Sequence, residues 1–102
     1  MTRPQKLADA DIASWLAAHP EWVRVGEALV RKYKLENFSR ALAFVTEVGM
    51  LAEKHDHHPD VELGWGKVQL LWSTHDAGGI TALDRSLAEA SDAAFSAYQK
   101  RA

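Results

Sequence analysis

The chain of 102 residues contains no cysteine, which excludes disulfide bonds and thiol catalysis. It also lacks an excess of either charge, because 12 lysines and arginines stand against 14 aspartates and glutamates and give a formal net charge of −2. A broad electrostatic attraction to nucleic acid or to an anionic membrane is therefore not expected. No apolar run resembles the core of a signal peptide or approaches the roughly 20 residues of a membrane span. These absences predict a soluble, cytoplasmic protein that binds neither nucleic acid nor membrane.

The length and the apolar content set the size of the fold. A chain this short predicts a single domain over residues 1–102. Its hydrophobic content of 47% suffices for one small core. Because a small domain has much surface for its volume, burial of apolar area between copies is favourable, and we expect a homodimer or a homotetramer.

Hydrophobic periodicity predicts three helices and two hairpins. Helical spacing of apolar residues indicates helices over 7–19, 38–55 and 83–98. Asn37 is expected to cap the second of these helices, and its predicted apolar face includes Phe38 and Leu42. Alternation of apolar and polar residues indicates hairpins over 22–35 and 60–75, the first with a tight turn at Gly26 and Glu27. The order α-β-β-α-β-β-α predicts an α+β fold, in which three helices pack on one face of a four-stranded antiparallel sheet.

The segment "AEKHDHHPD", residues 52–60, contains three of the five histidines. Pro59 prevents the second helix from continuing and favours an extended conformation at His58, so the segment lies at a helix end and in the following loop. In an antiparallel hairpin, the end of the last predicted strand returns beside the start of its partner. His75 is therefore expected near His57 and His58.

Three interpretations of this cluster are possible. His55, His57, His58 and His75 could bind a metal together with Glu53 or Asp56, but adjacent His57 and His58 cannot easily point at one ion and the spacing is not that of a zinc-binding helix. The helix end could also be merely a solvated polar segment, where Lys54 and His55 interact favourably with the helix dipole. The third interpretation is acid–base chemistry, for which three imidazoles at one sheet edge are well suited.

The motifs "DHHPD" and "GKVQLLWSTHDAGGIT", with Trp65 between them and Asp84 after them, resemble the pterin-4a-carbinolamine dehydratase family. The likeness extends from about residue 7 to residue 98. It implies dehydration of 4a-hydroxytetrahydrobiopterin or a related 4a-hydroxytetrahydropterin, in tetrahydrobiopterin recycling beside an aromatic amino acid hydroxylase. The pterin is then the substrate, and the reaction requires neither a cofactor nor a metal. Family members also form dimers and tetramers through sheet edges and helices, and we take the apolar sheet surface and the last helix as candidate contacts.

The resemblance also implies the residues of the site. His57, His58 and His75 match the catalytic histidines, with Glu53 as a carboxylate that orients one of them. The residues implied in substrate binding are Asp56, His57, His58, Pro59, Ser73, Thr74, His75 and Asp76. Asp84 matches a catalytic carboxylate, although as the fourth residue of "TALD" it could equally stabilise a helix N-terminus, where Thr81 and Asp84 resemble a capping box. Because the cluster lies in a loop and at a strand end, we expect loss of these imidazoles to impair turnover more than folding.

The sequence departs from the family pattern at Leu83, where relatives often have a basic residue, and at His55 and Gly66. A lost charge near the site affects substrate affinity or partner choice rather than proton transfer. A second functional class is a non-enzymatic interaction module, since some relatives act as a dimerisation cofactor or in the assembly of carbon-fixation enzymes. Retention of all three histidines favours the enzyme.

Overall fold

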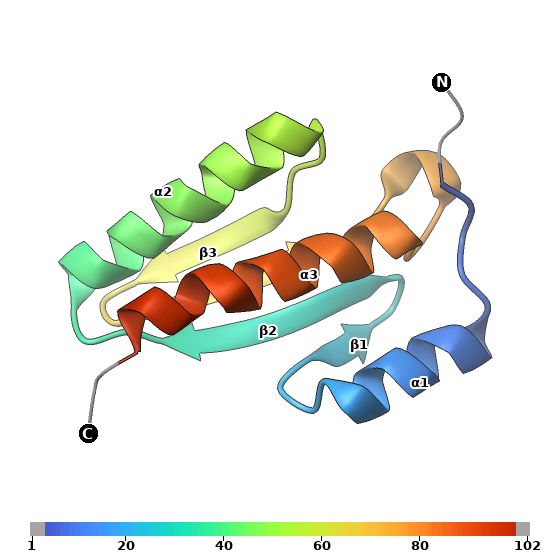
Figure 1. Ribbon diagram of the computed structural model, residues 1–102, viewed down its shortest axis with the longest axis horizontal. Helices are drawn as coiled ribbons and strands as arrows, with labels where there is room; N and C mark the ends of the chain where they lie inside the picture. The colour runs from blue at the N-terminus through green and yellow to red at the C-terminus, as the bar shows by residue number, and fades with distance from the viewer. Residues whose placement is uncertain (1–3, 100–102) are drawn as a thin grey trace.

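The computed structural model describes residues 4–99, which form one antiparallel sheet and three helices in the predicted order (Figure 1). The helices are α1 (Asp9–Ala18), α2 (Phe38–His55) and α3 (Ala82–Phe95), with single 3₁₀ turns at η1 (His75–Ala77) and η2 (Ser96–Tyr98). The strands are β1 (Val23–Val25), β2 (Ala28–Lys34), β3 (Asp60–Gly64) and β4 (Lys67–Trp72), in the spatial order β1-β2-β4-β3. The predicted α+β architecture is confirmed.

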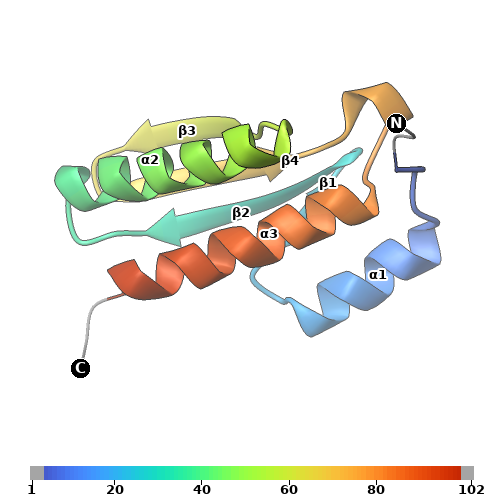
Figure 2. The ribbon, with the colours of Figure 1, turned by 45° about the horizontal axis from the view of Figure 1, so that its top comes forward.

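The sheet has one covered and one open face. Helices α2 and α3 lie side by side over the covered face, and α1 lies beyond α3 near β1 (Figures 1 and 2). Alternation along β4 points Val68, Leu70 and Trp72 into the core, where all three are buried. Among the helices of residues 4–99, none is long and apolar enough to cross a membrane.

Helix α2 begins at a side-chain cap and presents a different face from the predicted one. The side-chain oxygen of Asn37 accepts a hydrogen bond from the backbone N–H of Arg40 at 2.9 Å, which confirms the predicted N-cap. The predicted apolar face included Phe38 and Leu42, yet these two side chains are 45% and 47% exposed. The helix instead buries Ala41, Phe44, Val48 and Ala52. The apolar arc of α2 is therefore wider than the face that the helix buries, and part of this arc stays exposed.

Hydrogen bonds of Asp92 hold helix α3 against the sheet. The carboxylate of Asp92 accepts hydrogen bonds from the indole N–H of Trp22 at 2.9 Å, from Arg31 at 2.8 Å and from the hydroxyl of Tyr33 at 2.7 Å. Burial, with the hydrogen bond to Asp92, raises the pKa of Tyr33 far above its ordinary value. These bonds fix α3 relative to the sheet and thereby fix the position of its N-terminal residues, where the site lies.

The segment after β4 differs from the predicted strand. The predicted strand continued to His75, whereas β4 ends at Trp72 and His75 begins the 3₁₀ turn η1. Thr74 pairs with Gly79 in an isolated antiparallel bridge, and Gly78 takes a left-handed conformation with φ 76°. The chain therefore folds back on itself directly after the strand, because glycine permits the left-handed turn that closes this short loop.

Candidate active site

Most of the predicted site residues line a hollow of about 220 Å³. The hollow lies where β3 begins and β4 ends, since the register pairs Asp60 with Leu71. The lining residues are Asp56, His57, His58, Ser73, Thr74, His75 and Asp76. The expectation that the hairpin returns His75 to the neighbourhood of the paired histidines is confirmed. The volume is below the range of about 300–1,000 Å³ that is typical of drug-sized ligands, so the hollow suits a small molecule.

The end of α2 places His57 at this hollow. Asp56 adopts a left-handed conformation with φ 50° and ψ 43°, at the position where helices usually end with glycine. The backbone N–H of His57 donates to Ala52 at 3.1 Å, and that of Asp56 donates to Glu53 at 3.2 Å. These two bonds form a Schellman motif, which reverses the chain and turns the ring of His57 toward the interior.

His57 and Asp84 form a buried pair. Nε2 of His57 lies 2.7 Å from Oδ1 of Asp84, and the two side chains are 8% and 0% exposed. The ring of His57 also stacks on Trp72, with centroids 5.8 Å apart and planes 17° apart. A buried carboxylate that holds an imidazole in one orientation is a common arrangement in sites that transfer protons.

The other carboxylate oxygen of Asp84 accepts hydrogen bonds at the N-terminus of α3. Oδ2 accepts from the hydroxyl of Thr74 at 2.7 Å and from the backbone N–H of Thr81 at 2.9 Å. The Thr81 hydroxyl accepts from the backbone N–H of Leu83 at 3.3 Å, which completes the predicted capping box. The two interpretations of Asp84 are thus compatible, because one oxygen caps the helix while the other faces the histidine.

His58 and His75 are more open to solvent than His57. Nε2 of His58 lies 3.3 Å from a carboxylate oxygen of Glu53, with side chains 55% and 76% exposed, so this contact is long and weak. His75 is exposed and borders both the site hollow and a neighbouring hollow of about 340 Å³. These two imidazoles can therefore exchange protons with solvent.

Several predicted residues have roles that the sequence did not reveal. The hydroxyl of Thr74 points into the protein toward Asp84, and the hydroxyl of Ser73 donates to the backbone oxygen of Glu27 at 2.6 Å. Pro59 shapes the approach to β3 but does not line the hollow. From the sequence, Trp72 was expected in the core or at an interface and Thr81 in a helix cap, and neither was connected to His57. The alternation of apolar and polar residues along β4 already indicated that Trp72 faces the interior.

The other cluster and aromatic candidates lie elsewhere. His55 is exposed, and its Nδ1 lies 3.0 Å from the backbone oxygen of Leu51 in its own helix. Trp65 is 72% exposed at the β3–β4 turn, the end of the hairpin away from the hollow. Within residues 4–99, no three His, Asp or Glu side chains are grouped so that they could hold a metal ion.

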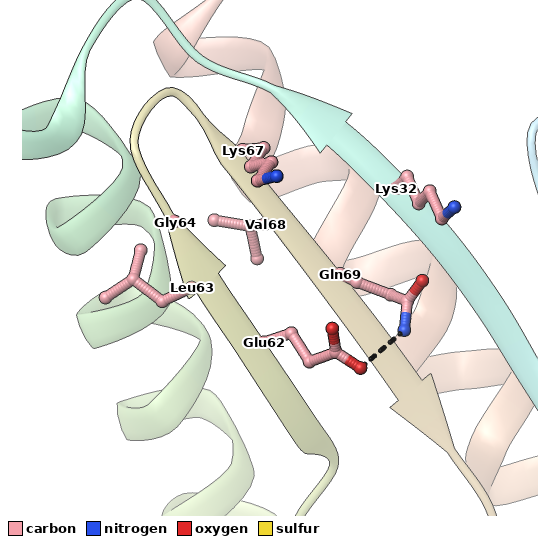
Figure 3. Close-up of a pocket in the computed structure, with 7 residues that line it drawn as sticks. All are labelled: Lys32, Glu62, Leu63, Gly64, Lys67, Val68 and Gln69. Atoms are coloured by element: carbon pink, nitrogen blue, oxygen red, sulfur yellow. Dashed lines mark hydrogen bonds between the residues drawn. The ribbon is translucent and has the colours of Figure 1, made fainter.

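A further hollow of about 250 Å³ lies near the β3–β4 turn (Figure 3). Its residues are Lys32, Glu62, Leu63, Gly64, Lys67, Val68 and Gln69. Figure 3 shows Gln69 hydrogen-bonded to Glu62, a contact of 3.2 Å. This hollow contains no histidine, and the three histidines of the predicted site lie at the opposite end of the hairpin.

Comparison with known families identifies the arrangement. Residues 5–94 match the model of the family described as pterin 4 alpha carbinolamine dehydratase. The chain belongs to this family. The histidines, the paired Asp84 and the hollow thus lie in a dehydratase-family fold, as the sequence resemblance implied.

Relatives in this dehydratase family are similar over most of the chain. A protein of Thermomicrobium roseum is 52% identical over 83 residues, which cover 81% of this chain and 89% of the relative. A protein of Chloroflexus aurantiacus is 46% identical over 87 residues, covering 85% and 94%. Both carry the name "Putative pterin-4-alpha-carbinolamine dehydratase".

Two solved structures share the fold. The crystal structure of a transcriptional coactivator/pterin dehydratase from Brucella melitensis superposes with a TM-score of 0.84 at 32% identity, covering 88% of this chain and 98% of that one. A pterin dehydratase-like protein described as a RuBisCO assembly factor in the alpha-carboxysome superposes with a TM-score of 0.62 at 21% identity, covering 72% and 88%. The second likeness concerns the fold alone.

Proposed function

We propose that the chain catalyses the dehydration of a 4a-hydroxytetrahydropterin, such as 4a-hydroxytetrahydrobiopterin, to the quinonoid dihydropterin and water. The 4a-hydroxyl group takes a proton and leaves as water, N5 loses a proton, and a double bond forms between C4a and N5. This elimination is redox-neutral, so it requires an acid and a base at the two positions. The pterin is the substrate, and the step serves the recycling of a hydroxylase cofactor.

The observation that carries this proposal is the buried His57–Asp84 pair at a hollow that two further histidines line. Asp84 holds one imidazole in place while His58 remains accessible to solvent. Imidazole both gives and takes protons near neutral pH, which is what the elimination needs at its two ends. Backbone groups of the lining residues at the ends of α2 and β4 can hydrogen-bond the flat amide edge of a pterin. Membership of the dehydratase family supports the same reaction.

A stopped-flow assay on freshly generated 4a-hydroxytetrahydropterin tests the proposal. The protein should accelerate formation of the quinonoid product, and His58→Ala should lose most of that acceleration. His55→Ala is the matched control, because His55 belongs to the same sequence cluster but lies outside the hollow. A rate equal to the spontaneous rate with the unmodified chain would contradict the enzymatic proposal.

A second candidate function is a non-enzymatic interaction or assembly module of the same fold. The observation that favours it is a set of exposed apolar side chains on α2, on the neighbouring edge strand β3 and on the β3–β4 turn, which we call the apolar strip: Phe38, Leu42, Val61, Leu63 and Trp65. Such a strip beside an edge strand is typical of a surface that another chain covers. Substitutions distinguish the two functions. A substitution in the strip should abolish assembly and spare turnover, whereas a substitution of His58 should abolish turnover and spare assembly.

A further inference from the structure

The two carboxylate oxygens of Asp84 serve different partners, and this division determines where the hydrogen atoms lie. Oδ1 faces Nε2 of His57, whereas Oδ2 faces the hydroxyl of Thr74 and the backbone N–H of Thr81. Thr74 is 2% exposed, and Thr81 and Asp84 are 0% exposed. Solvent cannot easily replace any of these partners, so loss of one leaves a buried polar group unmatched.

The hydrogen atoms around Oδ2 can be assigned. A backbone N–H can only donate, and the single hydroxyl hydrogen of Thr74 is directed at Asp84 over 2.7 Å. The hydroxyl of Thr81 lies 2.9 Å from the hydroxyl oxygen of Thr74 and 3.4 Å from Oδ2 of Asp84. With the Thr74 hydrogen directed at Asp84, Thr81 donates over the shorter contact, to Thr74. The result is a one-way chain of hydrogen bonds from Thr81 through Thr74 to Asp84, which ends on an oxygen that acts as an acceptor.

We propose that Thr74 is a positioning residue which, through Asp84, keeps a hydrogen on Nε2 of His57 and leaves Nδ1 as the nitrogen that exchanges a proton in the reaction. With Oδ2 held by its donors, Oδ1 is oriented to accept from Nε2–H. Among the described residues, no side chain or backbone group is hydrogen-bonded to Nδ1. A flip of the ring would place Cε1 against the carboxylate and lose the hydrogen bond to Asp84, so the ring that stacks on Trp72 keeps Nε2 toward Oδ1.

The role of Nδ1 rests on the proposed dehydratase function, whereas the tautomer is a property of the free protein. Thr74 borders the hollow, and the family resemblance placed it with the substrate-binding residues. Its hydroxyl, however, is directed at Asp84 and not at the hollow. A substrate contact would affect KM when it is removed, but a positioning contact should affect kcat.

The first experiment measures the tautomer without any substrate. Long-range ¹H–¹⁵N correlation of the ¹⁵N-labelled protein at about pH 8, where an ordinary imidazole is neutral, reports which nitrogen of His57 carries the hydrogen. We expect the Nε2–H pattern. An Nδ1–H pattern in the unmodified protein would overturn the inference whether or not the protein is a dehydratase.

Substitutions of Thr74 then test the positioning role. Thr74→Val should give a mixture of tautomers and lower kcat by about tenfold with KM nearly unchanged, because a buried hydrogen bond to a charged group is lost. Thr74→Ser retains the hydroxyl and should restore both properties. Thr46→Val is the matched control, since the Thr46 hydroxyl donates only to Leu42 in its own helix. A folded Thr74→Val that keeps a single Nε2–H tautomer would contradict the role. If that variant does not fold, a mixture of tautomers in Thr74→Ser would contradict it.

Discussion

Nε2 of His57 and Oδ1 of Asp84 lie 2.7 Å apart although the two residues are 27 positions apart in the chain. One residue follows the end of α2, and the other lies in the first turn of α3. The contact therefore joins the two helices that cover the sheet at the position where the hollow opens. Folding and the chemistry of the site depend on the same pair.

This pair leads to different expectations for the three histidines. Each imidazole should contribute to turnover, typically by about 10²–10⁴-fold for a general acid or base. His57→Ala should also lower stability by about 1–3 kcal/mol, because it leaves a buried carboxylate oxygen without its donor. The structure thus changes the expectation from sequence that all three losses would spare the fold.

His58→Ala and His75→Ala are the controls for stability, since both side chains are exposed. Their melting temperatures should stay close to that of the unmodified protein, whereas His57→Ala should melt several degrees lower. Thermal denaturation followed by circular dichroism, with stopped-flow kinetics on the same samples, measures both effects. Equal melting temperatures for all three variants would contradict a structural contribution from the buried pair.

The left-handed backbone conformation of Asp56 predicts that replacing this residue by glycine preserves stability but lowers activity. A left-handed residue other than glycine costs about 1 kcal/mol, so Asp56→Gly should be at least as stable as the unmodified protein. Turnover should fall, because the carboxylate lines the hollow. Chemical denaturation and the dehydration assay provide the two measurements.

Ala43→Gly is the matched control for Asp56→Gly, because Ala43 is an exposed residue inside α2. That substitution should destabilise the protein by about 1 kcal/mol. A comparable loss of stability in Asp56→Gly would show that the left-handed conformation carries no cost at this position.

The raised pKa of Tyr33 predicts how stability changes at alkaline pH. Burial and the hydrogen bond to Asp92 keep the Tyr33 hydroxyl protonated in the folded state, while the unfolded chain ionises near the ordinary value of 10. The unfolded state therefore loses a proton that the folded state retains, and stability should fall as the pH rises above about 10. Tyrosinate absorbance should show Tyr33 ionising only together with unfolding, and Tyr33→Phe should remove that part of the transition.

The exposed apolar strip predicts self-association. The large apolar side chains that are well exposed in the described part of the chain lie on β1, α2, β3 and the β3–β4 turn, and not on α3. This shifts the expected contacts from the last helix to α2 and the edge strand. Light scattering should give a mass that is a multiple of 11.3 kDa, and Leu42→Glu should lower it.

Met50→Glu is the control for self-association, because Met50 is 70% exposed on the same helix but lies outside the strip. It should leave the assembly unchanged. A mass near 11.3 kDa that persists at high protein concentration would exclude self-association and leave the catalytic proposal intact.

The acid–base interpretation predicts that activity requires no bound metal. Adjacent His57 and His58 point to different partners, one to Asp84 and the other to Glu53. Elemental analysis should find no stoichiometric zinc, iron or copper, and chelators should leave turnover unchanged. One tightly held metal per chain, with activity lost on chelation, would contradict the proposed chemistry.

The sequence determined the features that depend on neighbouring residues. The cap at Asn37, the capping box of Thr81 with Asp84, and the glycine turn after β1 each need only a few adjacent side chains. Apolar periodicity separated helices from strands for the same reason, because it reflects local backbone geometry. The hairpin pairing followed, and with it the return of His75 toward His57.

Only the tertiary structure decided which partner each buried polar group has. Asp84 could cap a helix or face a histidine, and it does both because α3 is fastened beside the end of α2. Thr74 could face the substrate or the interior, and the loop that follows β4 turns its hydroxyl inward. Phe38 has the spacing of a core residue, yet it is half exposed because the sheet ends beneath that side of α2. In each case the sequence pattern allows two environments, and packing between distant segments selects one of them. The physical reason is that a buried polar group must have a hydrogen-bond partner, whereas an apolar side chain is buried only where another surface covers it.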